Sequence, residues 1–92
     1  MSTNPAQLSF VECQPDADGE PRVTNYWRPA ADGSYAAQCQ EGRRRASEAV
    51  DYISVTGALP VLAWIVGAMP RGRDMGGAEI GFVSGLAAMA VA

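Results

Sequence analysis

The chain has 92 residues, of which 48% are hydrophobic and 18% are charged, and its formal net charge is −3. This composition excludes a disordered tail, which would be less apolar and more highly charged. A domain of this length buries about 60 to 65% of the surface of its unfolded chain, so we expect one domain, residues 1–92, with a small core. All seven basic residues are arginine and histidine is absent. Catalysis by histidine or by a lysine Schiff base is therefore excluded.

Residues 1–33 form the predicted hairpin region. Residues 7–13, QLSFVEC, and residues 22–28, RVTNYWR, alternate in polarity and contain strand formers. The interval QPDADGEP between them contains prolines and an Asp-Gly pair, which favour turns. The pattern predicts two antiparallel strands, the second of which ends at Pro29.

Residues 34–92 form the predicted helical region, which begins with a helix from about residue 35 to residue 56. Ser34 or Asp32 can cap its start, and Gly57 is placed to end it. At about 100° per residue, seven side chains fall within one arc that we expect to face the core. They are Tyr35, Cys39, Gly42, Ala46, Ala49, Val50 and Ile53.

The opposite face of this predicted helix is polar. Glu41 with Arg45, and Arg44 with Glu48, have the i,i+4 spacing of ion pairs on a helix. Tyr52 projects among these charges by the same periodicity. We therefore expect Tyr52 to be a contact residue for a partner.

Two more helices are predicted. The first follows Pro60, contains VLAWIVGAM and stops before Pro70; it is apolar all round, so we expect it to be buried between layers with Trp64 in the core. The loop PRGRDMGG and a helix over AEIGFVSGLAAMAVA follow. The predicted fold class is thus α+β: an N-terminal antiparallel hairpin packed on three helices, with the middle helix buried.

The long apolar segments raise a membrane alternative. Residues 52–69 contain no charge, and residues 75–92 contain only Glu79. Gly57 and Pro60 interrupt the first segment, leaving about 10 to 12 apolar residues, too few to span a bilayer. We therefore do not expect membrane insertion, and because the start MSTNPAQLSF lacks a signal-peptide pattern, we expect a cytoplasmic location.

Catalytic, metal and nucleotide motifs are absent from the sequence. DADGE resembles the start of a calcium loop, but the positions that need glycine and glutamate hold Pro21 and Trp27. Cys13 and Cys39 have no Cys-x-x-Cys spacing, so they are read as small buried residues, or as a disulfide in an oxidising compartment. We expect no enzyme activity, no cofactor and no metal.

The charge distribution argues against nucleic acid as the partner. Arginines 43–45 point around the helix rather than along one stripe and have acidic neighbours. Residues 1–33 contain five acids and two arginines, so the net negative charge lies in the hairpin region. An acidic hairpin fits a basic surface of another protein. By strand alternation, one of Tyr26 and Trp27 should pack inward and the other outward.

The predicted function is therefore non-enzymatic binding to a protein with a basic surface. The expected contact residues are Asp16, Asp18, Glu20, Tyr26, Trp27, Arg44, Arg45, Glu48 and Tyr52. In gross character the chain resembles the inhibitors that phages and mobile elements direct at bacterial defence complexes, such as anti-CRISPR proteins. That resemblance implies an inhibitor or adaptor that covers a basic surface with carboxylates. The alternatives are a small membrane protein with two hydrophobic helices, and a homo-oligomer subunit that associates through Gly77, Gly81 and Gly85.

Overall fold

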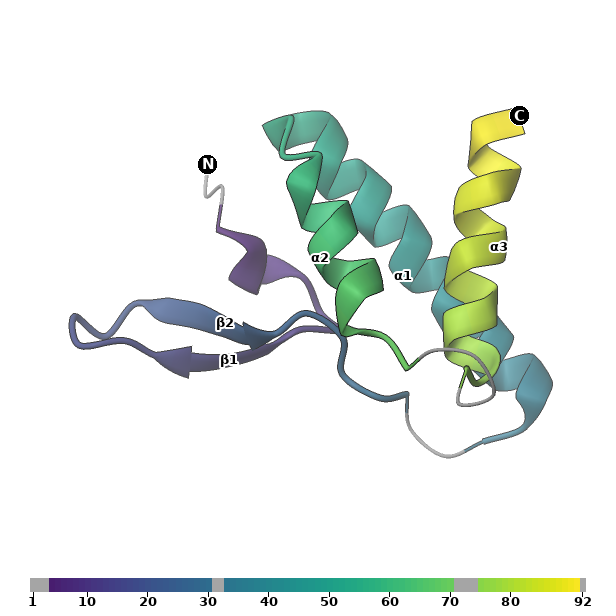
Figure 1. Cartoon of the computed structure of the whole chain (residues 1–92), viewed down its shortest axis with the longest axis horizontal. Coiled ribbons are helices and arrows are strands. Elements are labelled where there is room, and N and C mark those ends of the chain that lie inside the picture. Colours follow the sequence, from purple (N-terminus) through teal and green to yellow (C-terminus); the bar gives the residue numbers. More distant parts are fainter. Residues whose placement is uncertain (1–3, 31–32, 71–74, 92) are drawn as a thin grey trace.

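The computed structural model describes residues 4–30, 33–70 and 75–91. A short 3-10 helix, η1 (Pro5–Gln7), precedes the antiparallel strands β1 (Glu12–Pro15) and β2 (Pro21–Asn25), and three α-helices follow: α1 (Tyr35–Thr56), α2 (Pro60–Ala68) and α3 (Gly77–Val91). The predicted α+β architecture is confirmed. Figure 1 shows the hairpin projecting away from the helices, while α2 and α3 lie in front of α1 and diverge from each other.

The first strand begins later than the sequence predicted. The Asn4 side chain accepts a hydrogen bond from the backbone N–H of Ala6, and Pro5 occupies the first helical position, so Gln7 belongs to η1, while residues 8–11 form a turn and irregular backbone instead of a strand. Leu8, Phe10 and Val11 are all buried, and the expected alternation fails there. The strand prediction over residues 7–13 is therefore wrong except at its end.

The second strand ends earlier than predicted, at Asn25. The side-chain oxygen of Asn25 accepts a hydrogen bond from the backbone N–H of Trp27 at 3.2 Å, which turns the chain inward. The register pairs Glu12 with Asn25 and Pro15 with Pro21, with an irregularity after Glu12. The hairpin is thus a short ribbon, and the residues that flank it, Phe10, Val11 and Trp27, belong to the core.

Helix α1 has the predicted bounds. The Ser34 hydroxyl accepts a hydrogen bond from the N–H of Ala37 at 3.1 Å, and Gly57 ends the helix with φ of +71°, a left-handed conformation that glycine adopts without strain. Asp32, the other candidate cap, lies outside the described residues.

The buried face of α1 is rotated from the predicted arc. Tyr35 was expected in the core but is 62% exposed, whereas Arg45 and Tyr52 were expected on the polar face but are 2% and 5% exposed. The predicted exposure of Arg45 and Tyr52 is wrong. The aromatic rings of Phe10 and Trp27 lie under the guanidinium of Arg45, so segments outside α1 determine which of its faces is covered.

Glycines bring α1 and α3 into close contact. A Cβ on Gly42 of α1 would lie 2.1 Å from the carbonyl oxygen of Ala78, and a Cβ on Gly81 of α3 would lie 2.2 Å from that of Cys39. Gly77 and Gly85 also lie against α1, beside Gln38 and Ala46 respectively. The small-residue face of α3 therefore packs within the chain, and the prediction that it associates with a second copy is wrong.

Helix α2 is not buried, which corrects the prediction for the middle helix. Only Val61 and Ile65 are buried in it, on one face, and Trp64 is 51% exposed. Because α3 packs along α1 rather than over α2, the outer face of α2 has no covering layer in the described part of the chain. The prediction that Trp64 is a core residue is wrong.

The core lies where the base of the hairpin meets the three helices. It contains Leu8, Phe10, Val11, Trp27, Ala46, Ala49, Tyr52, Val61, Ile65, Met69, Ala78 and Phe82. Trp27 and Phe82 meet edge to face with their ring centroids 5.2 Å apart. Cys13 is exposed and Cys39 is half-buried, and they are not linked. Positions 71–74 of the predicted loop lie outside the described residues.

Candidate functional site

The three predicted acids of the hairpin turn are exposed. One carboxylate oxygen of Asp16 accepts hydrogen bonds from the backbone N–H groups of Asp18 and Glu20, at 2.9 and 3.0 Å. Asp16 therefore holds the turn, with Gly19 in a left-handed conformation at φ of +82°. The carboxylates of Asp18 and Glu20 project from a fixed turn and are accessible to a partner.

Every residue from position 12 to position 22 is exposed, on both faces of the ribbon. Four of these residues are carboxylates and one, Arg22, is a cation. Glu12 was not among the predicted contact residues; its carboxylate accepts a hydrogen bond from the Asn25 side chain at 3.2 Å, which places it at the base of the hairpin. The negative charge of the hairpin therefore extends from its turn to its base.

Tyr26 and Trp27 both follow the end of β2, and they differ in burial. Trp27 is 2% exposed and belongs to the core, so it is not accessible to a partner, and its prediction as a contact residue is wrong. Tyr26 is half-buried, and its ring centroid lies 5.5 Å from that of Trp64. Burial raises the pKa of Tyr26 above its usual value, so its hydroxyl stays protonated at neutral pH.

The predicted polar face of α1 is occupied by contacts within the chain. Glu48 accepts hydrogen bonds from both the backbone N–H and the hydroxyl of Ser9, each at 2.5 Å. Arg44 pairs with Glu48 and with Glu41, and its hydrogen bond lowers the pKa of Glu41 to about 2. Half of the Arg44 side chain remains exposed, whereas Glu48 mainly anchors the N-terminal segment.

Arg45 and Tyr52 fulfil structural roles instead of the contact roles predicted for them. The Arg45 guanidinium donates to the Arg28 carbonyl at 2.6 Å and to Glu41 at 2.7 Å while it lies over Trp27. Both side chains are buried, so neither is accessible to a partner.

Trp64 is an exposed residue that was not among the predicted contact residues. It lines a shallow hollow of about 550 Å³ together with Tyr26, Ala63, Gly67 and Ala68. The signal that could have revealed it is the length of the apolar run, because a helix of nine residues in so small a chain cannot be covered on every side. We call the exposed acids Glu12, Asp18 and Glu20, with Tyr26 and Trp64, the hairpin–Trp64 surface.

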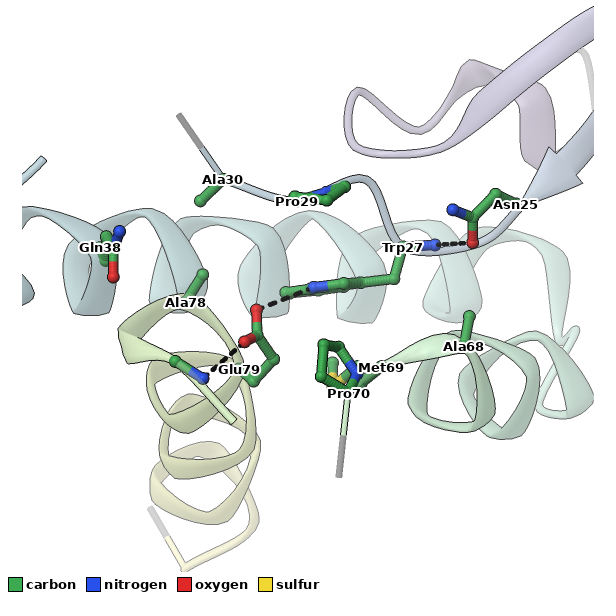
Figure 2. A pocket seen from close by; sticks show the side chains of 11 residues that line it. Asn25, Trp27, Pro29, Ala30, Gln38, Ala68, Met69, Pro70, Ala78 and Glu79 are labelled. Atoms are coloured by element: carbon green, nitrogen blue, oxygen red, sulfur yellow. Dashed lines mark hydrogen bonds between the residues drawn. The ribbon is translucent and has the colours of Figure 1, made fainter. Parts of the chain in front are cut away.

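A second hollow lies between the ends of α2 and α3. Figure 2 shows the Trp27 indole crossing it toward Glu79, with Met69 and Pro70 on one side and Ala78 on the other. The indole N–H of Trp27 donates to one carboxylate oxygen of Glu79 at 2.9 Å, and the backbone N–H of Gly76 donates to the other at 2.7 Å. The buried carboxylate is thus satisfied by two donors from different segments.

The hollow has a volume of about 460 Å³. Among the described residues that line it, Glu79 is the only ionisable side chain and none has a hydroxyl or a thiol. Across residues 4–30, 33–70 and 75–91, no group of three acidic, cysteine or histidine side chains is arranged to hold a metal ion.

Comparisons with known proteins give no relative. No family model, no curated protein and no solved structure matches the chain. Among the described residues, no helix has both the length and the apolar character needed to cross a membrane. The properties of the hairpin–Trp64 surface must therefore be argued from its own residues.

Proposed function

We propose that the protein is a non-enzymatic binding module that attaches to a basic surface of a partner protein through its hairpin–Trp64 surface, and so acts as an inhibitor or adaptor. We further propose that the protein acts in the cytoplasm.

The observation that carries this proposal is the exposure of residues 12–22 of the hairpin on both faces. A two-stranded ribbon is marginally stable in water unless something covers one face. Here both faces of Glu12–Pro15 are open, and β2 contacts η1 and, through Val23, the core. A partner that covers the ribbon would meet its carboxylates, which favour basic surfaces and accelerate association with them.

The exposed aromatic residues provide an apolar centre for such an interface. Tryptophan and tyrosine are enriched at the energetic centres of protein interfaces, surrounded by polar residues at the rim. Trp64 is half exposed and packs on Tyr26, which directly follows β2. The apolar hollow therefore adjoins the base of the acidic hairpin, so the two can form the apolar centre and the polar rim of one interface.

A capture experiment with matched charge variants tests the proposal. The tagged chain is used to isolate its partner from the source organism, and the purified partner is then titrated at several salt concentrations. Asp18→Arg should slow association several-fold and reduce its salt dependence, because it reverses one charge of the hairpin. Asp51→Arg makes the same charge change at an exposed position of α1 and should have a smaller effect. Equal effects of the two variants would show that the hairpin is not the contact.

The narrower role, an inhibitor of the anti-CRISPR type, is tested by the same capture. It requires that the partner be a nucleic-acid-binding complex and that the chain compete with nucleic acid for it. A partner without a nucleic-acid-binding surface would contradict this role but leave the broader one intact.

A second candidate function is self-association through the outer face of α3. Ile80, Val83 and Val91 are 37%, 44% and 86% exposed on that face, away from α1. Sedimentation at two concentrations tests it: Val83→Asp should abolish any dimer, whereas a wild-type chain that stays monomeric at high concentration would exclude this function.

A further inference from the structure

The two tryptophans of the chain differ in one respect that bears on the partner. The Arg45 guanidinium lies over the ring of Trp27, with its central carbon 4.7 Å from the ring centroid. Among the described residues, no arginine is placed over Trp64 in the same way, and Trp64 is 51% exposed. An indole face attracts a cation because its π electrons are partly negative, and arginine is the cation most often found there.

The hollow beside Trp64 has room for a flat cationic group. Its walls are the rings of Trp64 and Tyr26, inclined to each other by 49°. Its floor consists of small residues, and a Cβ built on Gly67 would meet no heavy atom within 4 Å. The surface of α2 beside Trp64 is therefore open at Gly67, and about half of the Trp64 side chain is accessible to a planar guanidinium.

The charge of the neighbouring hairpin selects a cation over an apolar side chain. Glu12 lies at the hairpin base and is bonded to Asn25, the residue before Tyr26. Asp18 and Glu20 add two exposed carboxylates in the turn. An apolar side chain would gain from the rings alone, whereas a basic segment gains from the rings and from the carboxylates together.

We propose that the hollow formed by Trp64 and Tyr26 binds an arginine side chain within a basic segment of the partner protein, while the carboxylates along the hairpin, from Glu12 at its base to Asp18 and Glu20 in its turn, pair with the other cations of that segment. This inference rests on the proposed function, because it specifies which chemical group of the partner the hairpin–Trp64 surface recognises.

Titration with synthetic peptides tests the proposal without knowledge of the partner. The probe is a capped ten-residue peptide of alternating arginine and glycine, added to the ¹⁵N-labelled full chain at low salt. Two matched peptides replace arginine with citrulline, which has the same shape without the charge, or with lysine. The indole N–H signals of Trp64 and Trp27 report binding at the proposed site and in the core, respectively.

The arginine peptide should shift the Trp64 signal saturably and leave the Trp27 signal in place. The citrulline peptide should cause no saturable shift, and the lysine peptide should bind more weakly. Trp64→Leu should raise the Kd of the arginine peptide by about two- to five-fold, as expected for a cation over an exposed ring, and Trp64→Phe should have a smaller effect. Leu59→Ala, which removes another exposed apolar side chain at the start of α2, should leave the Kd unchanged. The backbone amide of Gly67 reports binding in these variants.

Three results would overturn the inference: a Trp64 signal that does not move, an equal shift with the citrulline peptide, or a lysine peptide that binds as tightly. A peptide that perturbs only the amides of Asp18 and Glu20 would refute the arginine site while leaving the acidic hairpin as a binding surface. Conversely, a Trp64 shift together with a captured partner indifferent to Asp18→Arg would refute the hairpin's part in the proposed function and leave the arginine site standing.

Discussion

The two tryptophans offer the sharpest test of the structure, because the same substitution should have different costs at the two positions. Trp27→Ala removes a fully buried ring, and such a change costs about 3 to 5 kcal/mol of unfolding free energy. The substitution also removes the indole donor to the buried Glu79 carboxylate, and an unpaired buried polar group costs about 1 to 3 kcal/mol. The total loss should therefore be about 5 kcal/mol or more.

Trp64→Ala should cost much less. About half of the Trp64 side chain is already exposed, so the substitution returns only the buried half to water and leaves no closed cavity. At roughly 25 cal/mol per Å² and with a compact unfolded state, this amounts to about 1 to 2 kcal/mol. The difference between the two variants should therefore be at least about 2 kcal/mol.

Guanidinium denaturation followed by far-ultraviolet circular dichroism measures both values. A domain of this size has a total stability of roughly 5 to 14 kcal/mol, so Trp27→Ala can leave the chain unfolded. Trp27→Phe keeps an aromatic ring but removes the donor to Glu79, and should cost about 1 to 3 kcal/mol. Equal losses for Trp64→Ala and Trp27→Ala, or no loss for Trp27→Phe, would refute this assignment of core and surface.

Two further predictions follow from the helices. Gly42→Ala should destabilise the chain by about 1 to 3 kcal/mol, because a Cβ 2.1 Å from the Ala78 carbonyl oxygen forces α1 and α3 apart, a cost larger than the gain in helix propensity. Gly67→Ala, whose Cβ meets no heavy atom within 4 Å, is the control and should be neutral or stabilising by up to about 1 kcal/mol in the same denaturation assay. The hydrogen bond from Arg44 lowers the pKa of Glu41 from 4.5 to about 2, so the stability that Glu41 contributes is fully present above its unfolded pKa and is lost as the pH falls toward 2. Thermal melts between about pH 5 and about pH 2 should show a smaller decrease in Tm for Glu41→Gln than for the wild type, and parallel decreases would exclude this role of Glu41.

The sequence by itself determined where the helices and the hairpin turn begin and end, because these bounds depend on residues close together in the chain. Ser34 and Gly57 cap α1 through contacts with adjacent turns, so its bounds were predictable from the chain alone. Pro60 likewise marks the start of α2. The exposed acids of the hairpin could be predicted for the same reason, because turn residues specify a turn in any tertiary context.

The tertiary structure alone decided which apolar side chains are covered. Hydrophobic periodicity identifies the apolar faces of a helix, but it does not say which segment of the chain will lie against them. The sequence analysis placed Trp64 in the core and Trp27 among the contact residues. In the structure Trp27 is the core residue, because Arg45 lies over its ring and Glu79, from a different helix, accepts a hydrogen bond from its indole N–H. Gly42 of α1 and the glycines of α3 let these two helices approach each other closely, and in the described part of the chain the outer face of α2 is left uncovered. A domain this small can bury only some of its apolar faces, and contacts between segments far apart in the sequence determine which faces are buried.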